Sequence, residues 1–192
     1  MAKNLNIALF SLLLAGTLTA AGCLPRMRMG KGTPPAKYLE TFFKGDGEEL
    51  YFVKPFEWRA KEGKGEVTMD LTHNFKIDSV TGLTVNFTFG SEEPVKKLDA
   101  VSVKVGEGEV EGTAIERIFV EPAKKGYRNR YTFQMTWSGF EDVFGTETPE
   151  LKLQHKGGTF SYIPKKKWNK VREYIGKYMI TKIQLARETD EE

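Results

Sequence analysis

The sequence predicts a mainly β protein, either an antiparallel β-sandwich or an open barrel, with one late amphipathic helix. Apolar and polar residues alternate with a period of two in several short segments, and turn-forming residues separate these segments. One segment near the C-terminus instead spaces its apolar residues by three and four. We therefore expect seven to nine short strands in a single domain, residues 38–187, followed by an acidic tail at residues 188–192.

Each expected strand places its apolar side chains on one face, because successive side chains of a strand point to opposite faces. The strands are marked by Val67, Met69 and Leu71; Leu83, Val85, Phe87 and Phe89; Val101, Val103 and Val105; Tyr131, Phe133, Met135 and Trp137; Leu151 and Leu153; Phe160 and Tyr162; and Ile183 and Leu185. Turn signals lie between them at residues 62–65, 81–82, 91–94, 124–126, 145–146 and 156–159, the last of which suits a tight hairpin.

Two segments are expected to be helical. Residues 37–43 form one or two turns, and residues 164–178 form an amphipathic helix that begins near Pro164. The apolar face of the second helix contains Trp168, Val171, Ile175 and Tyr178, and its opposite face is basic, with Lys165, Lys166, Lys167, Lys170, Arg172 and Lys177. This basic face is either a contact surface for anionic lipid, a glycan or an acidic partner, or a solvated face of a helix packed on the sheet.

Composition excludes several classes of function. The 29 Lys and Arg nearly balance the 26 Asp and Glu, so the chain lacks the basic excess of a nucleic-acid-binding protein. A single cysteine excludes an internal disulfide, a CxxC pair and a multi-cysteine zinc site. The two histidines, His73 and His155, stand apart and form no metal-binding motif. We expect no cofactor and no metal.

The N-terminal segment has the pattern of a secretory signal. Lys3 provides a positive charge, residues 7–19 are uncharged and largely apolar, and the small residues Ala20, Ala21 and Gly22 come directly before Cys23. Two alternatives are an ordinary cleaved signal and an uncleaved membrane anchor. The strongly apolar part runs only from residue 7 to 14, which is short for a membrane span.

The stretch Leu18-Thr-Ala-Ala-Gly-Cys23 resembles the lipobox of bacterial lipoproteins, although Ala20 stands where leucine is commonest. This resemblance implies cleavage between Gly22 and Cys23, removal of residues 1–22, and addition of diacylglycerol and a further acyl chain such as palmitate to Cys23. A lone cysteine directly after a secretory signal supports it independently. The mature chain then has a formal charge of 28 − 26 = +2, because only Lys3 is lost among the charged residues.

Residues 23–37 are expected to form a lipidated tether, because the segment is rich in proline and glycine and has no periodic apolar face. Its basic residues lie beside the lipid, where they contact anionic headgroups or serve as a soluble spacer. Leu24 is not the aspartate associated with inner-membrane retention, so the resemblance implies an outer-membrane location. The lack of an acidic run after Cys23 favours the periplasmic face.

No motif in the sequence assigns catalytic residues, so we expect a non-enzymatic binding or assembly module of the bacterial envelope, with a protein partner or a ligand. The alternative is a hydrolase acting on envelope glycans or lipids through paired carboxylates, which the fold would have to bring together. The carboxylates considered for it are Glu107, Glu109, Glu111, Glu116, Glu141 and Asp142. The glutamates of residues 107–111 equally suit an exposed sheet edge.

Overall fold

A computed structural model describes residues 37–45, 47–76 and 82–188, of which 56% lie in β-strands. The strands are β1 (Leu39–Gly45), β2 (Glu48–Ala60), β3 (Glu66–Phe75), β4 (Leu83–Ser91), β5 (Ala100–Val105), β6 (Gly108–Glu111), β7 (Thr113–Pro122), β8 (Tyr127–Met135), β9 (Glu150–His155) and β10 (Gly158–Pro164). The predicted signal peptide, the lipidation of Cys23, almost all of the tether and most of the acidic tail lie outside the described residues.

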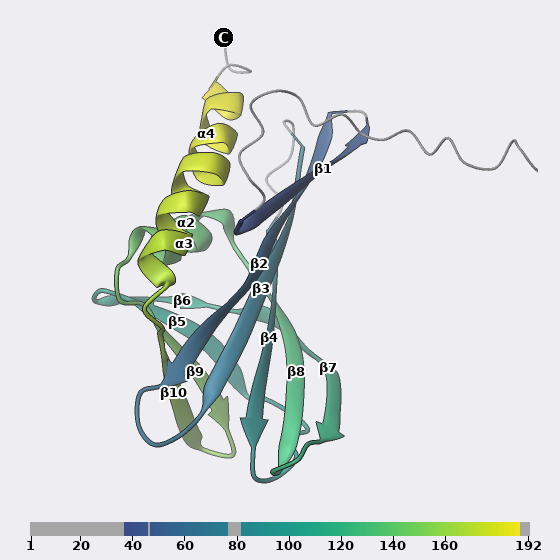
Figure 1. Ribbon diagram of the computed structural model, residues 1–192, viewed down its shortest axis with the longest axis vertical. Coiled ribbons are helices and arrows are strands. Elements are labelled where there is room, and N and C mark those ends of the chain that lie inside the picture. The colour runs from purple at the N-terminus through teal and green to yellow at the C-terminus, as the bar shows by residue number, and fades with distance from the viewer. Residues whose placement is uncertain (1–36, 46, 77–81, 189–192) are drawn as a thin grey trace, which may run out of the picture. The chain divides into compact units, whose positions relative to one another are not determined.

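The strands form one antiparallel sheet that curls into a half-barrel (Figure 1), which confirms the predicted mainly β class in its open-barrel form. The hydrogen-bonded order is β6-β5-β9-β10-β2-β3-β4-β8-β7, and β1 pairs with the first half of β2. The two outermost strands, β6 and β7, are consecutive in the chain and are separated only by Gly112. One stretch of backbone therefore borders both edges of the sheet.

Gly112 is the point at which this stretch leaves β5 and joins β8. Its N–H donates to the carbonyl oxygen of Val101 in β5, and the next residue, Thr113, pairs with Gln134 of β8. A Cβ at position 112 would lie 2.5 Å from a ring carbon of the fully buried Phe133. Glycine is therefore needed here for close approach of the backbone to the core.

The core fills the inside of the curl. Apolar side chains that alternate along β3, β4, β5, β8 and β9 are buried there, as their spacing predicts. Near the helices the core becomes aromatic: the rings of Phe56, Trp58, Phe144 and Trp168 contact one another with centroids 5.0 to 6.4 Å apart. Such tilted and edge-on ring pairs add stability beyond the area they bury.

The C-terminal helical segment lies at one end of the half-barrel (Figure 1) and consists of α3 (Trp168–Ile175), a π-helical turn η1 (Gly176–Ile180) and α4 (Thr181–Glu188). The predicted strand at residues 183–185 is wrong, because this segment continues the helix. Buried residues recur at steps of four, at Ile175, Met179 and Ile183, whereas Leu185 is exposed. None of the described helices has the length and apolar composition that a membrane crossing demands.

Other local predictions also differ from the structure. The helix predicted to begin near Pro164 begins at Trp168, because Pro164 still belongs to β10. The segment 37–43, expected to be helical, instead contributes most of β1, which pairs with β2 from Leu39 opposite Val53 onward. The strands β2 and β7 were not predicted. Trp137 does not extend β8 but begins helix α2 (Trp137–Gly145), whose first turn is capped by the Thr136 hydroxyl accepting from the Gly139 N–H at 3.1 Å.

Candidate binding site at the base of the half-barrel

A pocket of about 400 Å³, which we call the basal pocket, opens where β4 and the β9–β10 hairpin end. Figure 1 shows that this end of the sheet lies away from α4. The pocket is formed by the end of β4, the loop of residues 92–99 and the β9–β10 hairpin. Its lining residues are Lys64, Phe89, Gly90, Ser91, Glu92, Glu93, Val95, His155, Lys156, Phe160 and Tyr162. The volume lies within the range of small-molecule sites, near its lower end.

Apolar side chains from three segments line the inner part of the basal pocket. Phe160 and Tyr162 pair across strands with Leu153 and Leu151, so they share the inner face of the sheet with these buried leucines. Tyr162 is buried, but Phe160 is 45% exposed because it lies where the half-barrel opens. The pocket is therefore an accessible continuation of the hydrophobic core.

The loop of residues 92–99 is held in place by side chains of β8. The Asn129 side chain accepts from the N–H of Val95 at 3.0 Å and donates to the Ser91 hydroxyl at 2.8 Å and the Phe89 carbonyl at 3.3 Å. The Tyr131 hydroxyl donates to the Val95 carbonyl oxygen at 2.6 Å. Both backbone polar groups of Val95 are thus bonded to β8, and this side of the pocket is preformed.

The β9–β10 turn fixes the opposite side of the pocket. His155 Nδ1 lies 2.8 Å from the carbonyl oxygen of Lys97, and the Lys156 N–H donates to the Asp99 carboxylate at 2.9 Å. Lys156 and Gly157 have φ angles of 49° and 76°, the pattern of a two-residue hairpin turn with positive φ at both central residues. Glycine and asparagine suit this conformation better than lysine does.

The rim of the basal pocket carries both signs of charge. Lys64 and Lys156 contribute positive charge, and Glu92 and Glu93 contribute negative charge. A smaller depression of about 280 Å³ adjoins it and shares Lys64, Phe160 and Tyr162. The arrangement suits a ligand with an apolar body and polar ends.

The structure places the predicted basic face at the start of the C-terminal helical segment and just before it. Lys165 bridges Glu57 at 3.1 Å and Glu66 at 2.6 Å, and Arg172 pairs with Glu147 at 3.0 Å. These two cations therefore serve in ion pairs within the protein. Lys166, Lys167, Lys170 and Lys177 are exposed.

The carboxylates considered for hydrolysis lie in several settings. Glu107, Glu109, Glu111 and Glu116 are exposed, in or beside the edge strands β6 and β7, while Glu141 accepts from Gln184 at 2.8 Å and Asp142 is exposed on α2. Hydrogen bonds from Ser102 and Lys152 lower the pKa of Glu109, and one from Lys61 lowers the pKa of Glu150. A general acid needs a raised pKa, so these two lowered pKa values are opposite in direction to what hydrolysis requires.

In the described ranges, no three His, Cys, Asp or Glu side chains cluster to hold a metal.

The two histidines lie in different surroundings. His155 belongs to the basal pocket, whereas His73 is 1% exposed on β3, with its ring centroid 5.0 Å from that of Trp137. Burial lowers the pKa of His73 to about 4, and the Arg187 charge adds to this lowering. His73 is therefore a neutral core residue at neutral pH.

The sequence marked Phe160 and Tyr162 as strand residues but did not predict the pocket. The sequence did contain one signal for it. Phe160 has the same parity as Tyr162 and so faces inward, yet it lies only two residues after a Gly-Gly turn, where a core ends.

Comparison of the chain with models of protein families, with curated proteins and with solved structures finds no match. The function of this protein is therefore inferred from the residues of the site itself.

Proposed function

We propose that this protein is a lipid-anchored binding module of the bacterial envelope, held on the periplasmic face of the outer membrane through Cys23, and that the basal pocket takes a small amphipathic ligand. The preformed pocket, lined by Phe89, Val95, Phe160 and Tyr162 and rimmed by charges of both signs, is the observation that carries the proposal. The apolar lining receives the body of the ligand, and the rim meets its polar ends.

The first experiment measures binding of the fluorescent amphipathic anion 1-anilinonaphthalene-8-sulfonate. Phe160→Ser should weaken it, because a polar group replaces the exposed aromatic ring of the pocket. Ile118→Ser is the matched control: Ile118 is 50% exposed, close to the 45% of Phe160, but lies on β7 outside the pocket lining. Equal affinities of the two variants would refute the pocket as the binding site.

Lys156→Asn separates binding from folding. Asparagine adopts a positive φ more readily than lysine, so the free energy of unfolding should rise by about 0.5–1 kcal/mol. Affinity for the same probe should fall, because a rim cation is lost. A variant that gains stability and keeps full affinity would show that the Lys156 charge takes no part in the site.

The anchor is tested separately by labelling cells with radioactive palmitate. The wild-type protein should be labelled and Cys23→Ser should not, because the predicted acyl chains depend on that cysteine. Equal labelling of both proteins, or of neither, contradicts the lipoprotein assignment. This result does not depend on what the basal pocket binds.

A further inference from the structure

The β1–β2 hairpin exposes two consecutive phenylalanines. Phe42 is 46% exposed and Phe43 is 67% exposed. Because neighbouring residues of a strand point to opposite faces, the apolar side chains cover both sides of this strand end. A flat protein partner would contact one side only, whereas a bilayer surrounds an inserted hairpin on both sides.

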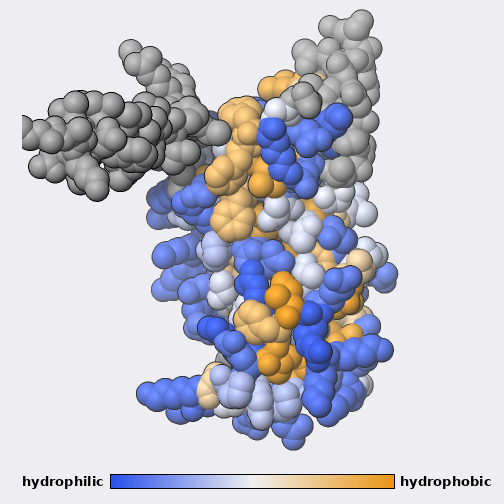
Figure 2. Space-filling view, turned by 90° about the vertical axis from the view of Figure 1, so that its right-hand side faces the viewer, coloured by the Kyte–Doolittle hydropathy of each residue, from blue (hydrophilic) through white to orange (hydrophobic). Residues whose placement is uncertain are grey.

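Exposed apolar side chains are sparse elsewhere in the described part of the chain. Figure 2 shows apolar residues along one side of the molecule as a broken band between hydrophilic areas. The large apolar side chains with high exposure are Phe42, Phe43, Ile118, Phe160 and Leu185. Phe42 and Phe43 are the two of this set that adjoin each other in the sequence, so this strand end exposes a large apolar side chain on each of its two faces.

The charges around the described part of the hairpin balance, because Lys44, Lys54 and Lys182 are matched in number by Glu40, Glu48 and Glu49. Lys182 lies 2.7 Å from the Glu49 carboxylate and 5.8 Å from the centre of the Phe43 ring. Lys54 pairs with Glu40 at 2.8 Å. Attraction to anionic headgroups is therefore weak here, and apolar insertion is the main source of affinity. This feature separates the hairpin from the basic face at residues 165–177, whose adsorption to lipid would depend on salt.

The course of the chain favours lipid as the occupant. β1 begins at Leu39, 39 − 23 = 16 residues after Cys23, and is the first described strand after the predicted anchor. An extended segment of that length spans at most about 55 Å, so an acylated Cys23 leaves the hairpin within reach of the bilayer. This step depends on the proposed lipid anchor.

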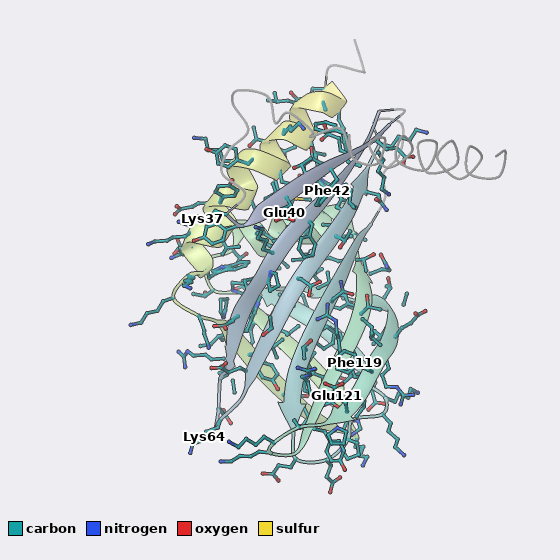
Figure 3. The ribbon with its side chains drawn as sticks, turned by 45° about the vertical axis from the view of Figure 1, so that its right-hand side comes forward. Lys37, Glu40, Phe42, Lys64, Phe119 and Glu121 are labelled. Carbon is teal, nitrogen blue, oxygen red and sulfur yellow. The ribbon has the colours of Figure 1, made fainter. Side chains whose placement is uncertain are left out.

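We propose that the end of the β1–β2 hairpin enters the interfacial layer of the bilayer that holds Cys23, with Phe42 and Phe43 as the inserted side chains. Figure 3 shows Phe42 and Lys64, a residue of the basal pocket, at opposite ends of the sheet. Glu49, opposite Phe43, and Ala60, opposite Tyr162, are eleven positions apart along β2, which corresponds to about 36 Å. The inserted hairpin therefore keeps the pocket in water.

The test uses the full lipidated chain in vesicles of phosphatidylethanolamine and phosphatidylglycerol. Phe43→Cys and, as matched control, Ile118→Cys each introduce one thiol, which is labelled with the environment-sensitive dye NBD. Acylation blocks Cys23, so the introduced thiol is the one that reacts. Nitroxide-labelled lipid should reduce the fluorescence of the dye at position 43 and leave that at position 118 unchanged, whereas aqueous iodide should do the reverse.

Two outcomes overturn the hairpin proposal alone: iodide quenching at position 43 equal to that at 118, or loss of the lipid quenching at about 1 M salt, where the screening length is about 3 Å. Lipid quenching that persists in salt supports insertion. Failure of the anchor gives a different result, because the wild-type protein would then react with the dye at Cys23. That result would overturn both the anchor and the inference that depends on it.

Discussion

Acidification from pH 7 to pH 5 should destabilise the protein through His73. The imidazole is 1% exposed on β3, and burial lowers its pKa from 6.5 to about 4. In the unfolded chain the same group is in water and accepts a proton near its ordinary pKa. Between these two values the unfolded state therefore binds more protons than the folded state, and the free energy of unfolding falls as the pH falls.

The magnitude follows from the two pKa values. At 1.36 kcal/mol for each pKa unit, the difference between 6.5 and about 4 corresponds to about 3 kcal/mol. The loss begins as the pH falls below 6.5 and is complete near pH 4. About 2 kcal/mol of it occurs between pH 7 and pH 5.

Urea unfolding of the wild-type protein and of His73→Leu at pH 7, 6 and 5 measures this effect. Carboxylates titrate in both proteins, so their contribution cancels in the difference, and the variant should lose about 2 kcal/mol less than the wild type over this range. Identical slopes for wild type and His73→Leu would refute the assignment of a buried neutral histidine.

Two further substitutions test the corner of the sheet and the loop of the basal pocket. Gly112→Ala should lower the free energy of unfolding by about 1–3 kcal/mol, measured by heat or urea, because the added Cβ would lie 2.5 Å from the buried Phe133 ring. The control Gly108→Ala should cost far less, because its Cβ would meet no atom closer than 3.6 Å. Asn129→Ala should cost about 1–3 kcal/mol and increase hydrogen exchange at the Val95 N–H, because that donor loses its partner. Unchanged exchange at Val95 would contradict the role assigned to Asn129.

The strands that the sequence predicts well are those whose alternation is unbroken. The period-two pattern does not predict β2, because its inward-facing residues change from odd-numbered to even-numbered positions. This change occurs around Pro55, where the pairing of β2 with β3 shifts between Val53 and Phe56. Tyr51 and Val53 point inward before the shift, and Phe56 and Trp58 are buried after it. A bulge of this kind interrupts a period-two pattern, and proline in a sheet is found at bulges or edges.

Short apolar spacings are ambiguous in a different way. Ile183 and Leu185 fit a strand when read alone, but Ile183 also lies four residues after Met179, so the preceding helix can continue through it. In the described structure the packing of Ile183 against the core decides between the two. For the basal pocket the local pattern gives only the inward parity of Phe160. The loop side of the pocket depends on hydrogen bonds of Val95 with the side chains of Asn129 and Tyr131, which are more than thirty residues away in the sequence.

The pocket and the hairpin lie at opposite ends of β2, and different contacts hold them. Val95 is fixed by β8, whereas β1 is held by its pairing with the first half of β2. Substitutions at sites this far apart with no shared partners usually act independently. Phe160→Ser should therefore weaken probe binding and leave lipid quenching at position 43 unchanged. A change in both would mean that the two ends are coupled through the sheet, and the separate roles proposed for them would be wrong.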